Sequence, residues 1–137
     1  MNEGSDRPKL KVLVVEDEAI TALVESRLID SFGYQSCGIA SNGEDAVLSF
    51  SRELPSIVCM DIGLPGSLDG IEAAALMLEA NRTCIIFITG YDDPERLRRA
   101  KSLDPVCLLI KPVSAEVLRR GLEAAALRIG PGKLGLR

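Results

Sequence analysis

Four apolar runs of this sequence end in residues that can do chemistry. A pair of acids, Glu16 and Asp17, follows the first run, and Asp61 follows another. Thr89 closes a third run, and Lys111 comes directly after a fourth. If these runs are parallel strands of one sheet, their carboxyl ends meet at one edge, which is where open sheets bind ligands. The sequence therefore predicts a single site with three carboxylates, one hydroxyl and one ammonium group.

The three acids would repel one another if they were ionised and close together. At about 4 Å and an effective dielectric constant near 20, each like-charged pair costs roughly 4 kcal/mol, so the site needs a counter-charge or a protonated member. Carboxylates and a loop carbonyl are hard oxygen ligands of the kind that Mg²⁺ prefers. With Mg²⁺ and Lys111 present, the pocket suits a phosphoryl group, and Asp61 is the carboxylate placed to attack it.

Each of these signals has a simpler alternative when it is taken alone. Glu16 and Asp17 are also what the N-terminus of a helix favours, and Asp61 could hydrogen-bond to its own turn. Thr89 could simply end a strand, and Lys111 could be a solvated lysine before a helix. The joint pattern is what favours one phosphoryl site over four unrelated strand ends.

Composition excludes several other classes of function. The 137 residues contain no histidine, which excludes histidine-based nucleophilic catalysis and histidine metal sites. Sixteen basic against 20 acidic residues give a net charge of −4, so nucleic acid is not an expected partner. The four cysteines lie in apolar segments without metal-binding spacing, and no apolar run approaches the length of a membrane span. We therefore expect buried thiols and a soluble, cytoplasmic protein without membrane contact.

Five β-rich runs alternate with five helical patterns along the chain. The later runs are apolar throughout, which is typical of strands covered on both faces. Strict alternation predicts a parallel sheet with helices on both faces. We therefore expect a single α/β domain with a doubly wound, five-stranded parallel sheet of order 2-1-3-4-5. The predicted strands are residues 11–15, 35–40, 56–60, 84–89 and 106–110.

The helical segments carry recognisable signals of their own. Ile20, Leu23, Val24 and Leu28 recur at helical spacing, so we expect them to form an apolar stripe on a first helix that ends at Gly33. The residues expected to open the other four helices are Asn42, Asp69 with Glu72, Asp93 with Pro94, and Ser114.

Four motifs, LVVEDE, MDIGLPGSLDGIEAA, FITGY and LIKP, occur in this order along the chain. Because they carry these four motifs, residues 9–128 resemble the receiver domains of two-component response regulators. Residues 1–8 are then a disordered tail, and residues 129–137 are a C-terminal tail or the stub of a linker. The resemblance implies a flavodoxin-like (βα)₅ fold in which Asp61 accepts a phosphoryl group from a phosphohistidine on a histidine kinase or a phosphotransfer protein.

The resemblance also implies a role for each residue of the site. Thr89 would move onto a phosphoryl oxygen, and Lys111 would pair with the phosphoryl group. The peptide bond before Pro112 would be cis, which only bonds to proline adopt at low cost. The residues implied to bind Mg²⁺ are Glu16, Asp17, Asp61 and, through its backbone carbonyl, Gly63.

The switch residues depart from the usual pattern of the family. Leu108 stands where the family commonly has a tyrosine or phenylalanine that rotates inward with the threonine. We hypothesise that Tyr91, two residues after Thr89, takes over part of that role; the alternative is a surface aromatic without a switching role. The resemblance places output on the fourth helix, fifth strand and fifth helix. The basic residues of that fourth helix are either part of a docking face, for a downstream protein or a homodimer, or an ordinary solvated surface.

The resemblance thus implies a phosphorylation-controlled switch of protein contacts, not an enzyme acting on other molecules. Two alternatives stay open: a receiver-like scaffold that ignores phosphorylation, and a Mg²⁺-dependent aspartyl phosphatase or phosphotransferase. Such enzymes usually place the nucleophile after the first strand and carry a cap, for which 137 residues leave no room. A flavin- or nucleotide-binding protein is less well supported, because no glycine-rich loop follows the first strand.

Overall fold

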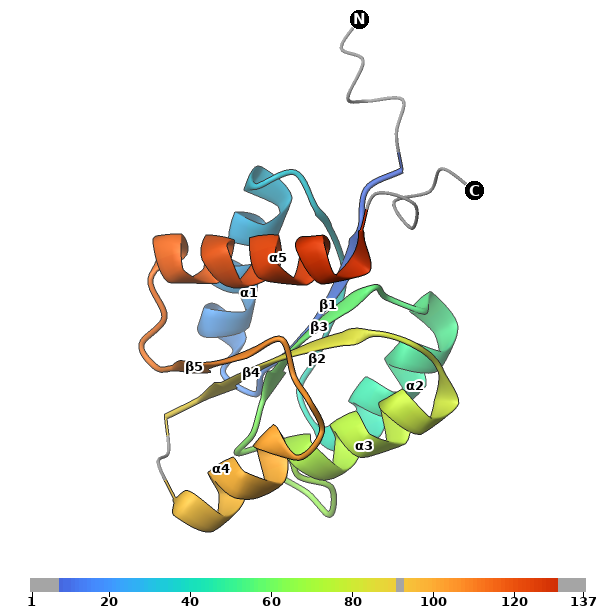
Figure 1. The fold of residues 1–137 in the computed structure, drawn as a ribbon, viewed down its shortest axis with the longest axis vertical. Helices are drawn as coiled ribbons and strands as arrows, with labels where there is room; N and C mark the ends of the chain where they lie inside the picture. The colour runs from blue at the N-terminus through green and yellow to red at the C-terminus, as the bar shows by residue number, and fades with distance from the viewer. Residues whose placement is uncertain (1–7, 91–92, 131–137) are drawn as a thin grey trace, which may run out of the picture.

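The computed structural model describes residues 8–90 and 93–130, in which five strands and five helices alternate (Figure 1). The observed strands agree with the predicted ones to within one residue at each end. The elements are β1 (Lys11–Val15), α1 (Ala19–Ser31), β2 (Gln35–Ala40), α2 (Gly43–Glu53), β3 (Ile57–Asp61), α3 (Gly70–Ala80), β4 (Cys84–Thr89), α4 (Pro94–Lys101), β5 (Cys107–Ile110) and α5 (Ala115–Ile129).

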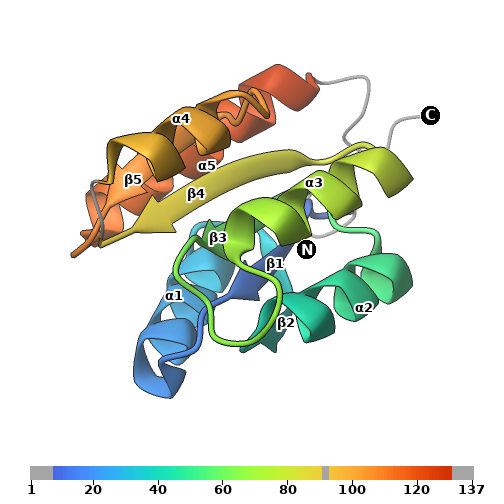
Figure 2. The same cartoon turned by 90° about the horizontal axis from the view of Figure 1, so that it is seen from below.

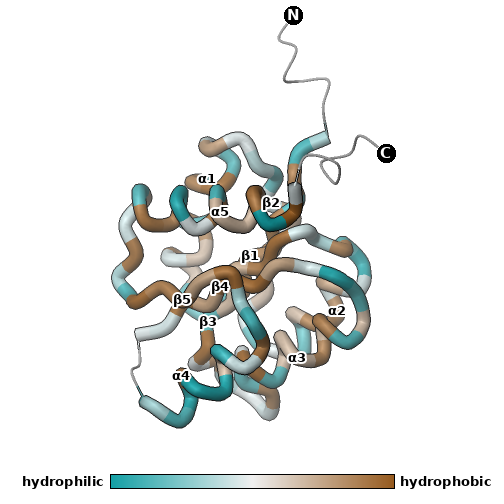
Figure 3. Tube along the Cα trace, in the orientation of Figure 1, coloured by the Kyte–Doolittle hydropathy of each residue, from teal (hydrophilic) through white to brown (hydrophobic). Residues whose placement is uncertain are grey.

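The strands form one parallel sheet in the order β2-β1-β3-β4-β5, which confirms the predicted topology. Helices α1 and α5 pack on one face of the sheet, and α2, α3 and α4 pack on the other (Figures 1 and 2). Strands β3 and β4 lie inside the sheet and are buried along their whole length, in the apolar centre of the molecule (Figure 3). The carboxyl ends of β1, β3, β4 and β5 therefore all lie at the same edge of the sheet.

The helix starts follow the capping signals of the sequence. Asn42 and Ser114 each accept a hydrogen bond from a backbone N–H in the first turn of α2 and α5. Asp69 and Glu72 form a capping box at α3, and Asp93 caps α4 in front of a proline. These caps fix where α3 and α4 begin.

The apolar stripe predicted on the first helix lies mostly on the side of α1 that faces away from the sheet. The exposed fractions of Ile20, Leu23 and Val24 are 80%, 46% and 52%, so they form an apolar stripe on the solvent side of α1. The buried residues of α1 recur at the same helical spacing as the exposed ones. Spacing alone therefore could not show which side of the helix packs on the sheet. Only Leu28 of the predicted set is packed against the core on this face of the sheet. The residues buried under α1 are Ala22, Glu25 and Ile29.

The four cysteines are free thiols, and all of them lie in the described part of the chain. Cys59 and Cys84 are buried as expected, whereas Cys37 and Cys107 are only half-buried because β2 and β5 are the edge strands. Among residues 8–90 and 93–130, no helix combines the length and apolar character needed to cross a membrane.

Candidate functional site

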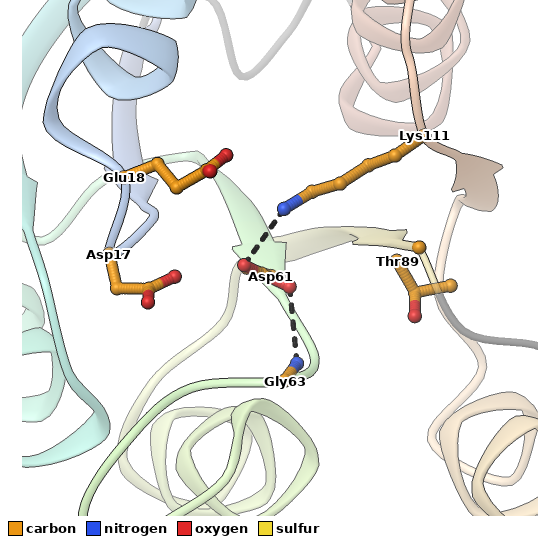
Figure 4. Close-up of a pocket in the computed structure, with 7 residues that line it drawn as sticks. Asp17, Glu18, Asp61, Gly63, Thr89 and Lys111 are labelled. Carbon is orange, nitrogen blue, oxygen red and sulfur yellow. Dashed lines mark hydrogen bonds and ion pairs between the residues drawn. The ribbon is translucent and has the colours of Figure 1, made fainter.

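A pocket opens at the carboxyl ends of β1, β3, β4 and β5, with a volume of about 350 Å³ (Figure 4). Asp61 lies at its centre, between Asp17 on one side and Thr89 on the other. The strand order accounts for this placement, because β3 is the direct neighbour of both β1 and β4. The pocket is lined by Asp17, Glu18, Asp61, Gly63, Thr89, Gly90 and Lys111.

Asp61 is the last residue of β3 and is held from two sides. Its Oδ1 accepts a hydrogen bond from the backbone N–H of Gly63 at 3.1 Å, and its Oδ2 lies 3.0 Å from Lys111 Nζ. The residue is only 6% exposed. Its backbone is fixed as well, because a Cβ added to Gly70 would lie 2.1 Å from the carbonyl oxygen of Asp61. The Asp61 carboxylate is thus largely buried, and it lines the pocket.

Glu16 is the most deeply buried acid of the site, with an exposed fraction of 2%. Its Oε1 lies 2.9 Å from Lys111 Nζ, and its Oε2 accepts a hydrogen bond from the N–H of Glu18 at 3.0 Å. Burial raises the pKa of Glu16 above its ordinary value, against the hydrogen bonds from Glu18 and Lys111, and the charge of Asp61 adds to the increase. The ionised form of Glu16 is therefore disfavoured by burial, and a cation beside it would stabilise that form.

Lys111 supplies the one ammonium group that contacts these acids among the described residues. Its Nζ is shared between Glu16 and Asp61. Partial burial opposes its charge, but the hydrogen bonds and charges of the two carboxylates outweigh burial and raise the pKa of Lys111 above its ordinary value. The lysine is charged at neutral pH. Its single charge does not balance three carboxylates, so the site still favours a cation.

The donor set fits Mg²⁺. Glu16, Asp17 and Asp61 each offer a carboxylate oxygen, and the three oxygens lie within 4.8 Å of one another. Two oxygens on opposite sides of an octahedral Mg²⁺ are about 4 Å apart, so these separations need little adjustment. Asp17 is exposed at the pocket mouth, where a bound ion would stay accessible to water. The residues present therefore suit a hard divalent cation.

The remaining predicted residues are placed as follows. Thr89 is the last residue of β4, is 2% exposed and lines the same pocket. The peptide bond between Lys111 and Pro112 is cis. Leu108 is half-buried and packs against the core cluster on the α2, α3 and α4 side of the sheet. Tyr91 lies outside the described residues.

Sequence reasoning missed three residues at or near this site. Glu18 lines the pocket, and its position beside the predicted acidic pair was a usable signal. Glu25 is buried under α1, and Arg96 of α4 reaches toward Gly63. Local sequence patterns could not identify Glu25 or Arg96, because the position of each side chain depends on how its helix packs against distant residues.

Comparison with known proteins places the fold and the site in a family. Residues 12–123 match the family described as the response regulator receiver domain. The chain is 30% identical over 118 residues to the transcriptional regulatory protein PdtaR of Mycobacterium tuberculosis, an alignment that covers 86% of this chain and 57% of the relative. It is 36% identical over 120 residues to the positive alginate biosynthesis regulatory protein of Pseudomonas aeruginosa, with 85% and 47% covered. The chain thus spans about half the length of these curated relatives.

Solved structures agree with the sequence comparison. The signal receiver domain of a modulated diguanylate cyclase from Desulfovibrio desulfuricans superposes with a TM-score of 0.80 at 40% sequence identity, covering 88% of this chain and 95% of that one. The receiver domain of PhyR from Erythrobacter litoralis superposes with a TM-score of 0.76 at 30% identity, covering 86% and 90%. Sequence, topology and the acidic pocket thus lead to one assignment: the chain belongs to the response regulator receiver domain family.

Proposed function

We propose that Asp61 accepts a phosphoryl group from a phosphohistidine on a histidine kinase or phosphotransfer protein, and that this modification switches the contacts of the domain. The observation that carries the proposal is the position of Asp61. Its carboxylate is buried at the base of the pocket, fixed from both sides, and flanked by two further acids and one lysine. Receiver domains are signalling modules that bind Mg²⁺ at such an acidic pocket.

The proposed reaction is an in-line transfer between two proteins. A carboxylate oxygen of Asp61 forms a bond to phosphorus while the phosphorus–nitrogen bond of the donor breaks, and the bonding electron pair stays on the donor imidazole. The Gly63 N–H and the Lys111 ammonium keep the carboxylate oriented toward the pocket. Lys111 also neutralises charge on the transferred group, and the Thr89 hydroxyl binds one of its oxygens once it is in place.

Mg²⁺ would be held by Glu16, Asp17, Asp61 and the backbone carbonyl of Gly63. When bound, it supplies positive charge next to the phosphoryl oxygens. The burial of Glu16 is the chain's own contribution, because a deeply buried carboxylate that Lys111 only partly balances favours a second cation.

The exposed apolar stripe of α1 is the proposed docking site for the phosphoryl donor. A donor must cover the pocket mouth, and the stripe begins at Ile20, two residues after the pocket residue Glu18. It continues along the helix through Leu23 and Val24. A donor that presents an amphipathic helix would bury these side chains while its phosphohistidine enters the pocket.

For output we propose the face formed by α4, β5 and α5, toward a downstream protein or a second copy of the chain. The edge strand β5 carries Ile110, which is 55% exposed, and α5 carries Val117, which is 39% exposed. The third element of this face, α4, carries basic residues in its last turn. The switch proposed for Tyr91 stays a prediction on residues outside the described structure.

The proposal also covers the cellular compartment, the limits of the domain and the reactions that the chain catalyses. Free thiols at all four cysteines suit a reducing compartment, so we place the protein in the cytoplasm. We keep residues 9–128 as the limits of the receiver domain. The chain would catalyse only its own phosphorylation and dephosphorylation, because the pocket beside Asp61 is small and open.

The test is intact mass after incubation with acetyl phosphate. We expect a gain of one phosphoryl group, about 80 Da, that requires Mg²⁺ and is absent from Asp61→Asn. A chain that stays unmodified with acetyl phosphate, with a phosphohistidine donor and with a beryllofluoride mimic would favour the phosphorylation-independent scaffold. Turnover of small phosphate esters would favour the aspartyl phosphatase instead.

A further inference from the structure

The four cations of α4 divide between the two sides of this short helix. Arg98 and Lys101 are exposed, and Arg98 pairs with Glu95 of the same helix. Arg96 and Arg99 are half-buried instead. Because they are three residues apart, they lie on the same side of the helix. That side faces the loop between β3 and α3.

Arg99 links α4 to the far end of this loop. Its Nη1 lies 3.6 Å from Oδ2 of Asp69, which is the N-cap of α3. The inner side of α4 therefore lies beside the start of α3 (Figure 1). The loop that Arg99 contacts is the one that leaves the site at Asp61.

Arg96 reaches the near end of the same loop. Its Nη1 lies 3.9 Å from the position that a Cβ on Gly63 would occupy, and apart from the chain neighbours of Gly63 no other atom of a described residue lies within 4 Å of that position. Gly63 lines the pocket, and its N–H donates to Oδ1 of Asp61. The guanidinium of Arg96 thus lies beside Gly63, which is one of the residues that line the pocket.

We propose that Arg96 binds the phosphoryl group on Asp61 and thereby couples α4 to phosphorylation; this inference rests on the proposed function. A phosphoryl group adds a charge of about −1.5 to −2 and three acceptor oxygens. A guanidinium binds such oxygens with two parallel hydrogen bonds. Lys111 already forms ion pairs with Glu16 and Asp61. Gly63 has no side chain of its own to stand between its backbone and the guanidinium of Arg96.

This contact gives the chain a route to α4 that does not need an aromatic residue at position 108. Leu108 offers no hydrogen-bonding group, and it packs in the core. Arg96 lies in the first turn of α4, which begins after the cap at Asp93. Drawing Arg96 toward the phosphoryl group also moves the helix side that carries Arg99. The element that responds is therefore the whole of α4, which has only eight residues.

Hydrogen exchange of the full chain, with and without acetyl phosphate and Mg²⁺, tests the proposal. In the native chain we expect amide exchange in residues 94–101 to slow by about threefold or more on phosphorylation. Arg96→Gln is expected to lose this protection, and Arg96→Lys to restore part of it, because lysine keeps the charge without the bidentate geometry. Arg98→Gln is the matched control, since it removes the same charge from the same helix and is expected to behave like the native chain.

A second variant tests the geometry independently of charge. Gly63→Leu places a side chain where the guanidinium now lies, so we expect it to abolish the protection of α4 even though Arg96 is intact. Equal protection in the native chain, Arg96→Gln and Gly63→Leu would overturn the inference and leave the proposed function standing. A native chain that gains no phosphoryl group would overturn the proposed function, and the inference with it.

Discussion

Replacing Glu25 with glutamine is expected to remove a pH-dependent instability from the native chain. Glu25 lies on the buried side of α1 and is 8% exposed. Burial raises the pKa of Glu25 from 4.5 to about 7, and the charges of Glu16 and Asp61 add to the increase while Lys111 opposes it. The group therefore holds its proton in the folded chain at a pH where the unfolded chain has released it.

The size of the effect follows from this difference. A tenfold change in acidity corresponds to about 1.4 kcal/mol, so ionising Glu25 in the folded state costs about 3 kcal/mol in total. The stabilising contribution of the protonated group is complete below pH 4.5 and is lost as pH rises through about 7. Between pH 5 and 8, the free energy of unfolding of the native chain should fall by about 2 to 3 kcal/mol relative to Glu25→Gln.

Urea unfolding in the presence of a chelator measures this difference directly. The native chain and Glu25→Gln are compared at several pH values, so that contributions from Glu16 and other acids cancel between the two curves. Glu79→Gln is the matched control, because Glu79 is exposed on α3 and should leave the pH dependence unchanged. Parallel curves for the native chain and Glu25→Gln would refute the reasoning.

Three further predictions concern the site and its access. Gly70→Ala adds a Cβ that overlaps the backbone of Asp61, so we expect a loss of about 2 kcal/mol or more in urea unfolding, together with slower phosphorylation; unchanged stability would contradict the close approach. Lys111→Met leaves Glu16 without its ammonium partner, so at pH 7 without Mg²⁺ it should cost about 2 kcal/mol. That loss should shrink as the pH is lowered, because the raised pKa of Glu16 lets it take up a proton more readily than an ordinary glutamate. Leu23→Asp should slow transfer from a protein donor about tenfold or more without changing labelling by acetyl phosphate; equal effects on both donors would argue against α1 as the docking site.

Much of the fold follows from local sequence signals. The continuous apolar runs mark strands that are covered on both faces, and β3 and β4 are buried along their whole length. Capping residues such as Asn42 and Ser114 mark where helices begin. The convergence of Asp17 and Asp61 then follows from the strand order, because neighbouring parallel strands end at one edge of the sheet.

What local signals cannot supply is the rotation of each helix about its axis. On α1, the apolar residues at Ile20 and Leu23 point to solvent, while the acidic Glu25 points to the sheet. Helical spacing is the same for both sides, so the choice depends on packing against residues distant in sequence. The approach of Arg96 to Gly63 has the same origin, because it depends on how α4 packs against the loop that follows β3.

Locating the phosphoryl group tests the central claim most directly. The chain is labelled with acetyl phosphate and Mg²⁺, treated with borohydride, which reduces an acyl phosphate at aspartate to homoserine, and mapped by peptide mass spectrometry. Our account predicts homoserine at position 61 only, and none in a sample prepared without Mg²⁺. Reduction at Glu16 or Asp17 instead, or a label that persists in Asp61→Asn, would contradict it.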